Sequence, residues 1–291
     1  MARQLRARKP KEQRPKKAKV LIHGPAGVGK TWTSLDFPNC YYIDVEGGAT
    51  NEQYQHKLEE SGALYFGQDD GASDFLTVLE EIKTLAMTKH DRKTLIIDSY
   101  SKLFLSSIAE EEERLSDGGE KIAFGNEKKP AVKFSRRLVT WLDKLDMNVI
   151  VVCHEKAKWK NGEQVGETFD GWDKMEYELD LCLQITKAGP ERRATVRKSR
   201  LAGFPDAQTF EWSYDEFARR YGRDQIESDV SVLMPATSDQ VTKLSNLVEV
   251  VKLDEGTKTK WLDKAGVDSF SEMDSDTIQS CIDFLSKKVA A

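Results

Sequence analysis

The sequence predicts an α/β fold with a mostly parallel central sheet that helices cover on both faces. Three observations support this prediction. Strand-length apolar runs alternate with amphipathic helical patterns up to residue 153, an alternation typical of parallel sheets. A glycine-rich loop follows the first run. After residue 178 three strand-like runs follow one another without long helices between them, which indicates an antiparallel extension at one side of the sheet.

Each element follows from its own pattern, in chain order. Apolar runs that end in polar residues predict strands, and apolar residues repeated every three to four positions predict helices. Two polar segments, residues 116–130 and 154–173, are predicted to be loops. The predicted strands are 19–23, 41–45, 63–66, 93–98, 148–153, 179–186, 193–198 and 208–212, and the predicted helices between them are 29–36, 73–87, one that ends near residue 115, and 131–145.

The C-terminal part is predicted to be a small helical domain. Met234-Pro235 marks a boundary, and Thr237-x-x-Gln240 has the capping-box pattern that begins a helix. The predicted organisation is a basic arm at 1–18, a core at 19–225, a linker at 226–235 and the helical domain at 236–291.

Composition indicates a protein without membrane-spanning segments. Of the 291 residues 32% are charged, and the best apolar run, at 149–153, is strand-sized, far short of the roughly 18 residues that cross a bilayer. Four scattered cysteines lack paired metal-ligand spacing. This predicts free thiols in a reducing compartment, the cytoplasm.

Charge is distributed unevenly along the chain. Nine Lys and Arg residues stand against one Glu in residues 1–19, whereas the whole chain has a net charge of −5. A basic arm gains free energy from counterion release when it binds a nucleic acid. A tail that only improves solubility is the alternative that stays open.

The loop at residues 24–31 is suited to holding phosphates. Its backbone N–H groups can point at phosphate oxygens, and its glycines allow the tight wrap. Lys30 can neutralise β- and γ-phosphates, and Thr31 can supply an oxygen ligand to Mg²⁺. ATP and Mg²⁺ are therefore the predicted cofactors. The predicted nucleotide-binding residues are Gly24, Pro25, Ala26, Gly27, Val28, Gly29, Lys30, Thr31 and Trp32.

Acidic residues end two of the predicted strands. Asp98 follows an apolar run and can orient the water shell of Mg²⁺, so Thr31 and Asp98 are the predicted metal site. Asp44 and Glu46 end another strand, at the edge where open α/β sheets bind ligands. Either acid could prepare a water for attack on the γ-phosphate, or could cap the next turn.

These motifs, in this order, resemble those of RecA-type ATPases. "GPAGVGKT" resembles the Walker A loop, "YYIDVEG" the strand that ends in the catalytic glutamate, "TLIIDS" the Walker B strand and "VIVVCHE" the strand that ends in the γ-phosphate sensor. "ATVRKSRLAGFP" with "QTFEWSYDEF" resembles the β-hairpin that supplies cations to a neighbouring subunit. The resemblance covers residues 19–222. More narrowly, the chain is similar to phage-encoded single-strand annealing and recombination ATPases.

The resemblance implies a role for each matching residue. Glu46 would activate the attacking water and Asp98 would serve Mg²⁺. His154 would sense the γ-phosphate at a position where glutamine is usual. Lys198 and Arg200 would act on the nucleotide of the next subunit, which implies a homo-oligomer, either a filament or a ring. The predicted catalytic residues are thus Glu46, Lys30, Asp98, His154, Lys198 and Arg200.

Two segments, residues 120–137 and the loop after His154, occupy the positions of the DNA-binding loops of RecA-type proteins. Cations can follow the backbone of a single strand, and aromatic faces can stack on its bases without sequence preference. The alternative is a solvated helix start and a loop whose aromatic residues close the core. The first segment includes Lys121 and Phe124. The predicted single-stranded DNA contacts are Lys128, Lys129, Lys133, Arg136, Arg137, Lys156, Lys158, Trp159 and Lys160.

The predicted function is that of a P-loop ATPase that binds single-stranded DNA as an oligomer in phage recombination or strand annealing, in the cytoplasm of the host cell. A single-strand binding protein is a further expected partner, and a membrane is not. Two alternatives stay open because one core can serve many purposes. One is a helicase- or packaging-type motor, and the other is a non-hydrolysing DNA-binding scaffold switched by ATP.

Overall fold

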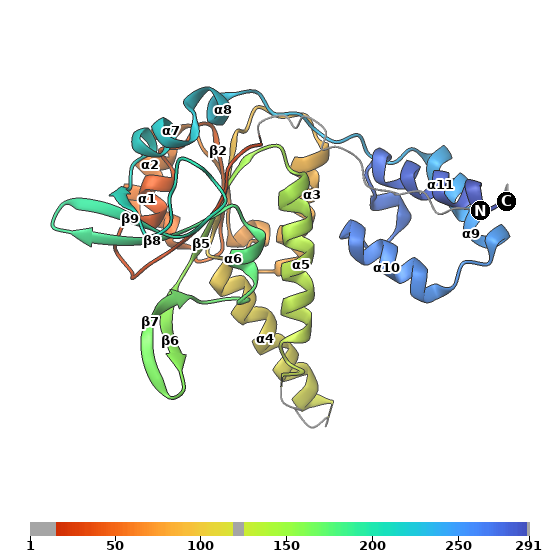
Figure 1. The fold of residues 1–291 in the computed structure, drawn as a ribbon, viewed down its shortest axis with the longest axis horizontal. Coiled ribbons are helices and arrows are strands. Elements are labelled where there is room, and N and C mark those ends of the chain that lie inside the picture. The colour runs from red at the N-terminus through yellow and green to blue at the C-terminus, as the bar shows by residue number, and fades with distance from the viewer. Residues whose placement is uncertain (1–15, 119–124, 290–291) are drawn as a thin grey trace, which may run out of the picture.

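An eight-stranded sheet forms the centre of the fold (Figure 1). The computed structural model of the protein describes residues 16–118 and 125–289. Across the sheet the strands lie in the order β10-β9-β8-β1-β5-β4-β2-β3. They are β1 (Lys19–His23), β2 (Cys40–Asp44), β3 (Leu64–Phe66), β4 (Thr94–Asp98), β5 (Asn148–Cys153), β8 (Leu181–Ala188), β9 (Glu191–Ser199) and β10 (Thr209–Glu211).

The central strands β1, β4 and β5 are buried along their whole length, as expected for apolar runs covered on both faces. Strand β1 pairs in parallel with β5 on one side and β8 on the other, and β5 pairs in parallel with β4. Strand β5 therefore separates β1 from β4. As a result, the residue that follows β5 lies between the loop after β1 and the end of β4.

The other side of the sheet is antiparallel. Strand β9 runs back along β8, and β10 pairs with β9, because the connections here are turns rather than crossover helices. The predicted class is confirmed: the fold is α/β, with a mostly parallel central sheet, an antiparallel extension and a helical C-terminal region.

Helices cover both faces of the sheet. An apolar cluster on one face includes residues of α3, α4 and α5, and a second cluster on the other face includes residues of α2, α7 and α8. None of the helices in the described ranges is long and apolar enough to cross a bilayer. The helices are α1 (Lys30–Ser34), α2 (Glu52–Ser61), α3 (Phe75–Met87), α4 (Tyr100–Asp117), α5 (Lys129–Lys144), α6 (Met175–Glu178), α7 (Tyr214–Tyr221), α8 (Arg223–Glu227), α9 (Ser238–Val251), α10 (Glu255–Ala265) and α11 (Ser275–Val289).

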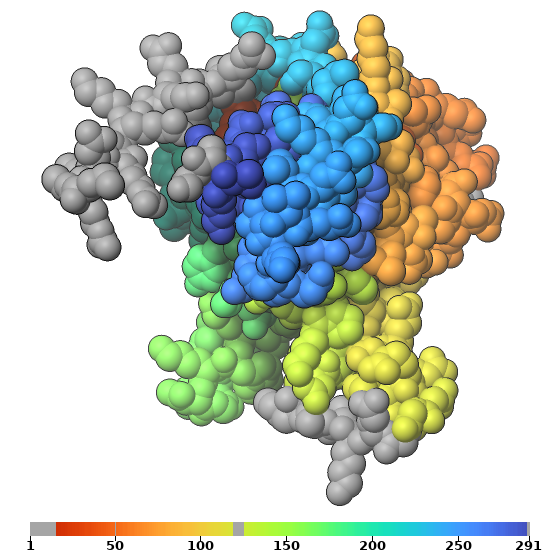
Figure 2. All heavy atoms as spheres, turned by 90° about the vertical axis from the view of Figure 1, so that its right-hand side faces the viewer, coloured from red at the N-terminus to blue at the C-terminus, as the bar shows by residue number. Residues whose placement is uncertain are grey.

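The C-terminal helices α9, α10 and α11 lie together beside the α5 face of the sheet (Figures 1 and 2). Leu244 of α9 and Ile278 of α11 belong to the same apolar cluster as Trp141 of α5. The Trp141 indole Nε1 donates a hydrogen bond to the Gly266 carbonyl at 2.9 Å. The apolar core of these helices is thus continuous with that of the sheet, and the division of the chain into domains stays a prediction.

Arg137, a predicted DNA contact, lies in this C-terminal interface. Its side chain is 8% exposed, and its guanidinium donates to both carboxylate oxygens of Asp268. A planar guanidinium in a paired, mostly buried position contributes to packing. Arg137 therefore holds α5 against the segment that follows α10 and does not face solvent.

A β-hairpin stands where the sequence predicts a loop at 154–173. It consists of β6 (Glu155–Lys160) and β7 (Glu163–Phe169), joined by Asn161 and Gly162, which both have positive φ. Such a two-residue turn matches the twist of a hairpin. The strands were not predicted because both of their faces are mostly polar, which leaves no apolar alternation to detect. The hairpin projects from the same end of the molecule as the end of α4 and the start of α5 (Figures 1 and 2).

The N-terminal boundary of the packed core lies earlier than predicted. Residues 1–15 of the basic arm are outside the described ranges. Lys17 and Ala18, assigned to the arm, are buried. The Lys17 ammonium donates to the carbonyls of Gln225, Ile226 and Ser228 at 3.0, 3.2 and 2.6 Å, so the chain is anchored at residue 17.

We expect Arg137→Ala to loosen the C-terminal helices. The change removes both hydrogen bonds to Asp268 and opens space beneath Asp268, so it should cost about 1–3 kcal/mol of stability. Thermal unfolding and limited proteolysis between α8 and α9 would measure this loss. Arg136→Ala is the matched control because Arg136 is exposed on the same helix. Equal melting temperatures for the two variants would contradict the assigned role of Arg137.

Candidate active site

The phosphate loop, residues 24–31, borders a cavity of about 490 Å³ at the carboxyl edge of the sheet. Lys30 Nζ donates to the carbonyls of Gly24 and Pro25 at 2.7 and 2.9 Å, so its charge lies inside the curve of the loop. Burial lowers the pKa of Lys30, and the nearby Asp98 and Glu46 carboxylates oppose that shift. The loop thus presents a cation and backbone N–H groups to the cavity, as phosphate binding requires.

Gly24 is a place where only glycine fits. A Cβ at this position would lie 2.2 Å from the backbone oxygen of Ile185 on β8, well inside van der Waals contact. The close approach fixes the start of the loop against the neighbouring strand. The phosphate loop is therefore positioned by β8 as well as by β1.

Thr31 and Asp98 meet at the floor of the cavity. The Thr31 hydroxyl donates to Asp98 Oδ2, and the Tyr42 hydroxyl lies 3.4 Å from the same oxygen. The Thr31 side chain comes from α1 and the Asp98 side chain from the end of β4. The metal site that the sequence predicts at Thr31 and Asp98 stays a prediction.

Asp98 is strongly perturbed by its surroundings. Burial raises the pKa of Asp98 to about 6, the Thr31 hydrogen bond opposes the rise, and the Glu46 and Asp44 charges add to it. An acid that is costly to ionise is a common feature of ligand-binding sites. A cation beside Asp98 would relieve that cost.

The donor set fits Mg²⁺ shared with a nucleotide. A hydroxyl and a carboxylate are the hard oxygen ligands that Mg²⁺ prefers, and phosphate oxygens usually complete its coordination. Among the described residues no group of three or more His, Cys, Asp and Glu side chains could hold a metal by itself. Thr31 and Asp98 are thus two ligands that would need phosphate oxygens as partners.

Glu46 and His154 form a polar cluster across the cavity from Lys30. His154 Nε2 lies 2.5 Å from Glu46 Oε1, and the Ser99 hydroxyl donates to the same oxygen at 2.5 Å. Burial alone would raise the pKa of Glu46, but the hydrogen bonds from Ser99 and His154 outweigh it and hold the pKa below its usual value. Glu46 is therefore an ionised, oriented carboxylate at neutral pH.

Asp44 has a different environment from Glu46. Its carboxylate accepts hydrogen bonds from the backbone N–H groups of Gly47 and Ala49 at 2.8 and 2.9 Å, and from the Tyr65 hydroxyl at 3.1 Å. Asp44 therefore caps the turn after β2. The sequence did not distinguish Asp44 from Glu46, but the structure does. Asp44 caps a turn, whereas Glu46 binds Ser99 and His154 at the cavity.

His154 is held at its backbone and joined to the hairpin. Its N–H donates to the Ser101 hydroxyl at 2.8 Å, and Glu155, the next residue, is the first of β6. Glu155 Oε1 accepts a hydrogen bond from Gln184 of β8 at 2.7 Å and lies 3.3 Å from His23 Nδ1. Polar contacts thus connect the cavity, the base of the hairpin and the antiparallel side of the sheet.

A comparison with known protein families identifies the type of domain. A family model described as an AAA domain matches residues 16–202. The chain belongs to the AAA domain family. This AAA domain is a P-loop nucleoside triphosphatase by family. The crystal structure of the RadB recombinase is similar at 15% identity, covering 67% of this chain and 87% of that chain with a TM-score of 0.43; the likeness is too distant to assign a role to any residue. A search of curated proteins found no match.

The AAA domain does not bring Lys198 and Arg200 to its own phosphate loop. Arg200 N donates to Asp180 O, and Asp180 N donates to Lys19 O, so Arg200 is level with the start of β1, whereas the loop follows the end of β1. Lys198 and Arg200 donate to the carbonyls of Leu179 and Tyr177. Both are thus away from the cavity of their own subunit.

The remaining predicted DNA contacts of the AAA domain lie on two projecting elements. Lys128 caps α5, and Lys129, Lys133 and Arg136 are on its first turns and exposed. Lys121 and Phe124 lie outside the described residues. On β6, Lys158, Trp159 and Lys160 are exposed, with Trp159 at 64%. Lys156 pairs with Asp170 at 3.1 Å.

Sequence reasoning missed three residues that the AAA domain places at or beside the cavity. Ser99 binds Glu46, Tyr54 of α2 lines the cavity, and Arg192 of β9 lies against Gly29. A signal existed for Arg192, because Gly189-Pro190 predicts a tight turn and two arginines follow it after Glu191. No comparable signal points to Tyr54, which lies in a polar helix.

We expect Asp98→Asn to stabilise the ligand-free fold in a pH-dependent way. The pKa of Asp98 is raised from 3.8 to about 6 on folding, so its ionisation costs stability progressively as the pH rises from about 4 to 6, and the full cost applies above 6. Asparagine removes that cost. The variant should gain on the order of 1–3 kcal/mol at pH 8 and little at pH 4.

Thermal unfolding at the two pH values measures the difference. Asp44→Asn is the matched control and should lose stability, because an amide offers one acceptor oxygen where the Asp44 carboxylate uses both. A gain for Asp98→Asn that is the same at pH 4 and pH 8 would contradict the assigned protonation.

Proposed function

We propose that this protein binds and hydrolyses ATP with Mg²⁺ and acts on single-stranded DNA as an oligomer in recombination or strand annealing of phage DNA. The observation that carries the proposal is the juxtaposition of Glu46 and His154 with the Lys30, Thr31 and Asp98 side chains around one cavity. Membership of the AAA domain family supports the nucleotide part. The DNA part is supported by the exposed lysines on β6 and on the start of α5, two elements that project from one end of the molecule.

The phosphates of ATP would lie along the loop, where Lys30 exchanges its carbonyl partners for phosphate oxygens. Mg²⁺ held by Thr31 and Asp98 would neutralise charge on the β- and γ-phosphates. Glu46 would orient the attacking water and accept its proton. Because hydrogen bonds keep Glu46 ionised, it is ready to accept that proton at neutral pH.

His154 would connect ATP to DNA. Its ring binds Glu46 in the described structure, and a γ-phosphate oxygen in the cavity would compete for the same nitrogen. A change of partner would free Glu46 for water and shift the chain at Glu155, where the hairpin begins. ATP would thus alter the position of Lys158 and Trp159.

The oligomer in this proposal uses Lys198 and Arg200 on the nucleotide of the next subunit. Their separation from the phosphate loop of their own subunit is what a residue acting between subunits requires. The proposed setting is the cytoplasm of the host cell, with a single-strand binding protein as a further partner.

We expect Glu46→Gln to block hydrolysis while nucleotide binding survives. Loss of the general base should lower kcat by about 10²–10⁴-fold, whereas the phosphate loop is unchanged. Lys30→Ala should abolish binding because it removes the loop cation. ATP turnover and titration calorimetry with ADP would measure the two effects.

Glu60→Gln, on the exposed face of α2, is the control for Glu46→Gln and should behave as the wild type. Full turnover by Glu46→Gln would overturn the assignment of the base. Strand annealing by Glu46→Gln at the wild-type rate would favour a scaffold that ATP switches over a hydrolysis-driven protein.

We expect the hairpin to contribute to DNA binding through both charge and stacking. Lys158→Ala with Lys160→Ala should reduce the slope of affinity against salt by about 1.4, near 0.7 for each phosphate contact on a single strand. Trp159→Ala should cost about 1–3 kcal/mol at any salt concentration. Fluorescence anisotropy with labelled oligothymidylate would measure both. Lys260→Ala on α10 is the control, and equal losses from it would remove the hairpin from the DNA site.

A further inference from the structure

Arg192 lies against the phosphate loop of its own subunit. It is the second residue of β9, directly after the turn from β8. A Cβ at Gly29 would lie 2.0 Å from Arg192 Nε and 3.0 Å from its Cζ. The guanidinium therefore touches the residue that precedes Lys30, in the segment whose backbone N–H groups hold phosphates.

The Arg192 guanidinium has no partner among the described residues. Its Nε is buried without a hydrogen bond, and within residues 16–118 and 125–289 the Arg192 side chain makes no hydrogen bond or ion pair. The neighbouring arginines differ: Arg193 pairs with Glu191 at 2.8 Å, and Arg197 donates to Gln184. A buried donor without an acceptor costs free energy, so its retention here points to an acceptor supplied by a ligand.

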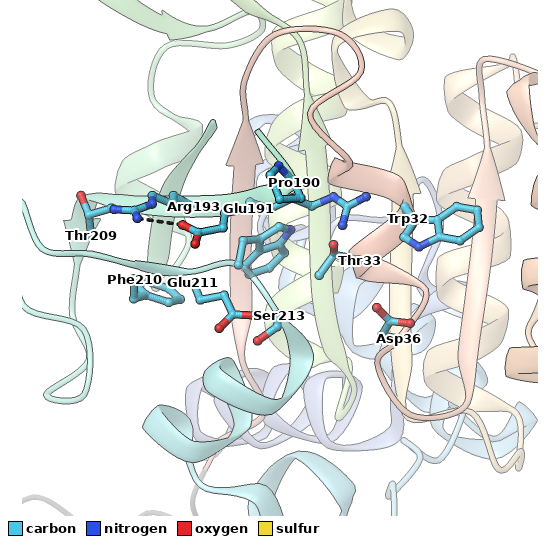
Figure 3. Close-up of a pocket in the computed structure, with 12 residues that line it drawn as sticks. Trp32, Thr33, Asp36, Pro190, Glu191, Arg193, Thr209, Phe210, Glu211 and Ser213 are labelled. Atoms are coloured by element: carbon cyan, nitrogen blue, oxygen red, sulfur yellow. Dashed lines mark hydrogen bonds and ion pairs between the residues drawn. The ribbon is translucent and has the colours of Figure 1, made fainter. Parts of the chain in front are cut away.

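Arg192 lines one cavity and lies against Gly29 of the loop that borders another. It lines a cavity of about 650 Å³ between α1 and the β9–β10 side of the sheet. In Figure 3, Trp32, Thr33 and Asp36 lie on one side of this cavity, and Pro190, Glu191 and Arg193 on the other. Burial raises the pKa of Tyr54, and the Arg192 charge opposes that rise, which puts the guanidinium within electrostatic reach of the phosphate-loop cavity that Tyr54 lines.

We propose that Arg192 is a nucleotide-binding residue that donates to α- and β-phosphate oxygens of the nucleotide on its own subunit. This inference rests on the proposed function. The phosphate oxygens held at Gly29 to Trp32 would be the acceptors nearest to its guanidinium. A planar fork of donors suits phosphate oxygens.

Lys30 and Arg192 would contact different phosphates of the nucleotide because they approach the loop from different sides. Lys30 and the Glu46 cluster serve the γ-phosphate, where the chemistry occurs. Arg192 contacts the α- and β-phosphates, which ATP and ADP both carry, so the contact contributes to the binding of both nucleotides. The β-phosphate is also the leaving group of hydrolysis, so loss of the contact raises KM and lowers kcat by a smaller factor.

The test compares Arg192→Ala and Arg192→Lys with Arg193→Ala as the matched control. Titration calorimetry with ADP and with inorganic pyrophosphate gives affinities, and ATP turnover gives kcat and KM. We expect Arg192→Ala to weaken ADP and pyrophosphate alike by about 10- to 100-fold, the range for a charge-assisted hydrogen bond. KM should rise by a similar factor, and kcat should fall by less. The ADP and pyrophosphate affinities of Arg192→Lys should lie between those of the wild type and of Arg192→Ala. Those of Arg193→Ala should match the wild type.

Folding is a separate readout. Because the Arg192 side chain has no polar partner among the described residues, Arg192→Ala should melt at the wild-type temperature, so weaker binding cannot be attributed to misfolding. Unchanged ADP affinity in Arg192→Ala would overturn the inference. Loss of ADP affinity without loss of pyrophosphate affinity would also overturn it, because Arg192 would then serve the base or the ribose.

A mixing experiment tests the same-subunit assignment. Arg192→Ala and Lys30→Ala proteins are mixed and assayed for ADP binding. No recovery is expected if Arg192 and Lys30 serve one nucleotide, and recovery in the mixture would overturn the assignment. If Arg192→Ala binds ADP normally and Lys30→Ala does not bind it, the inference about Arg192 fails and the proposed function still stands. Absence of ADP and pyrophosphate binding by the wild type would refute both proposals.

Discussion

Three carboxylates meet at the carboxyl edge of the sheet, and the way each is stabilised determines what it can do. Like charges this close cannot all be ionised without cost. Backbone N–H groups satisfy Asp44, and Ser99 with His154 satisfies Glu46. Asp98 accepts hydrogen bonds from the Thr31 and Tyr42 hydroxyls, has no backbone or cationic donor among the described residues, and has a raised pKa. The unrelieved charge is therefore concentrated beside Thr31, where a cation would be bound.

The parallel sheet creates this arrangement. Insertion of β5 between β1 and β4 places His154 between the phosphate loop and the end of β4. The same order of strands gives His154 a contact with Glu46 on one side and joins it to the hairpin on the other. One topological feature thus accounts for the cluster and for its connection to a distant surface.

Local patterns in the sequence were sufficient for the elements that depend on local physics. The phosphate loop, the buried strands and the Thr237 capping box follow from residue types at fixed spacing, and the structure contains all three. The distinct environments of Asp44 and Glu46 could not be predicted, because they depend on Tyr65, Ser99 and His154, which are remote in sequence.

Arginines were the least predictable residues. Arg137 pairs with Asp268, 131 positions further along the chain, and Arg192 meets Gly29 only because β9 folds back along β8. When an arginine's contacts lie far away in the sequence, the residues around it do not indicate whether its side chain is exposed or buried. The polar β6–β7 hairpin was missed for a related reason, since its strands lack an apolar face.

The attachment of the hairpin to His154 has a mechanical consequence. Strand β6 has six residues and therefore extends about 20 Å from its base. A rotation of about 10° at Glu155 would displace the far end by roughly 3 Å over that length, about the length of one hydrogen bond. The hairpin would then act as a lever arm. A rotation at its base too small to disturb the packed sheet would move Trp159 far enough to make or break a contact.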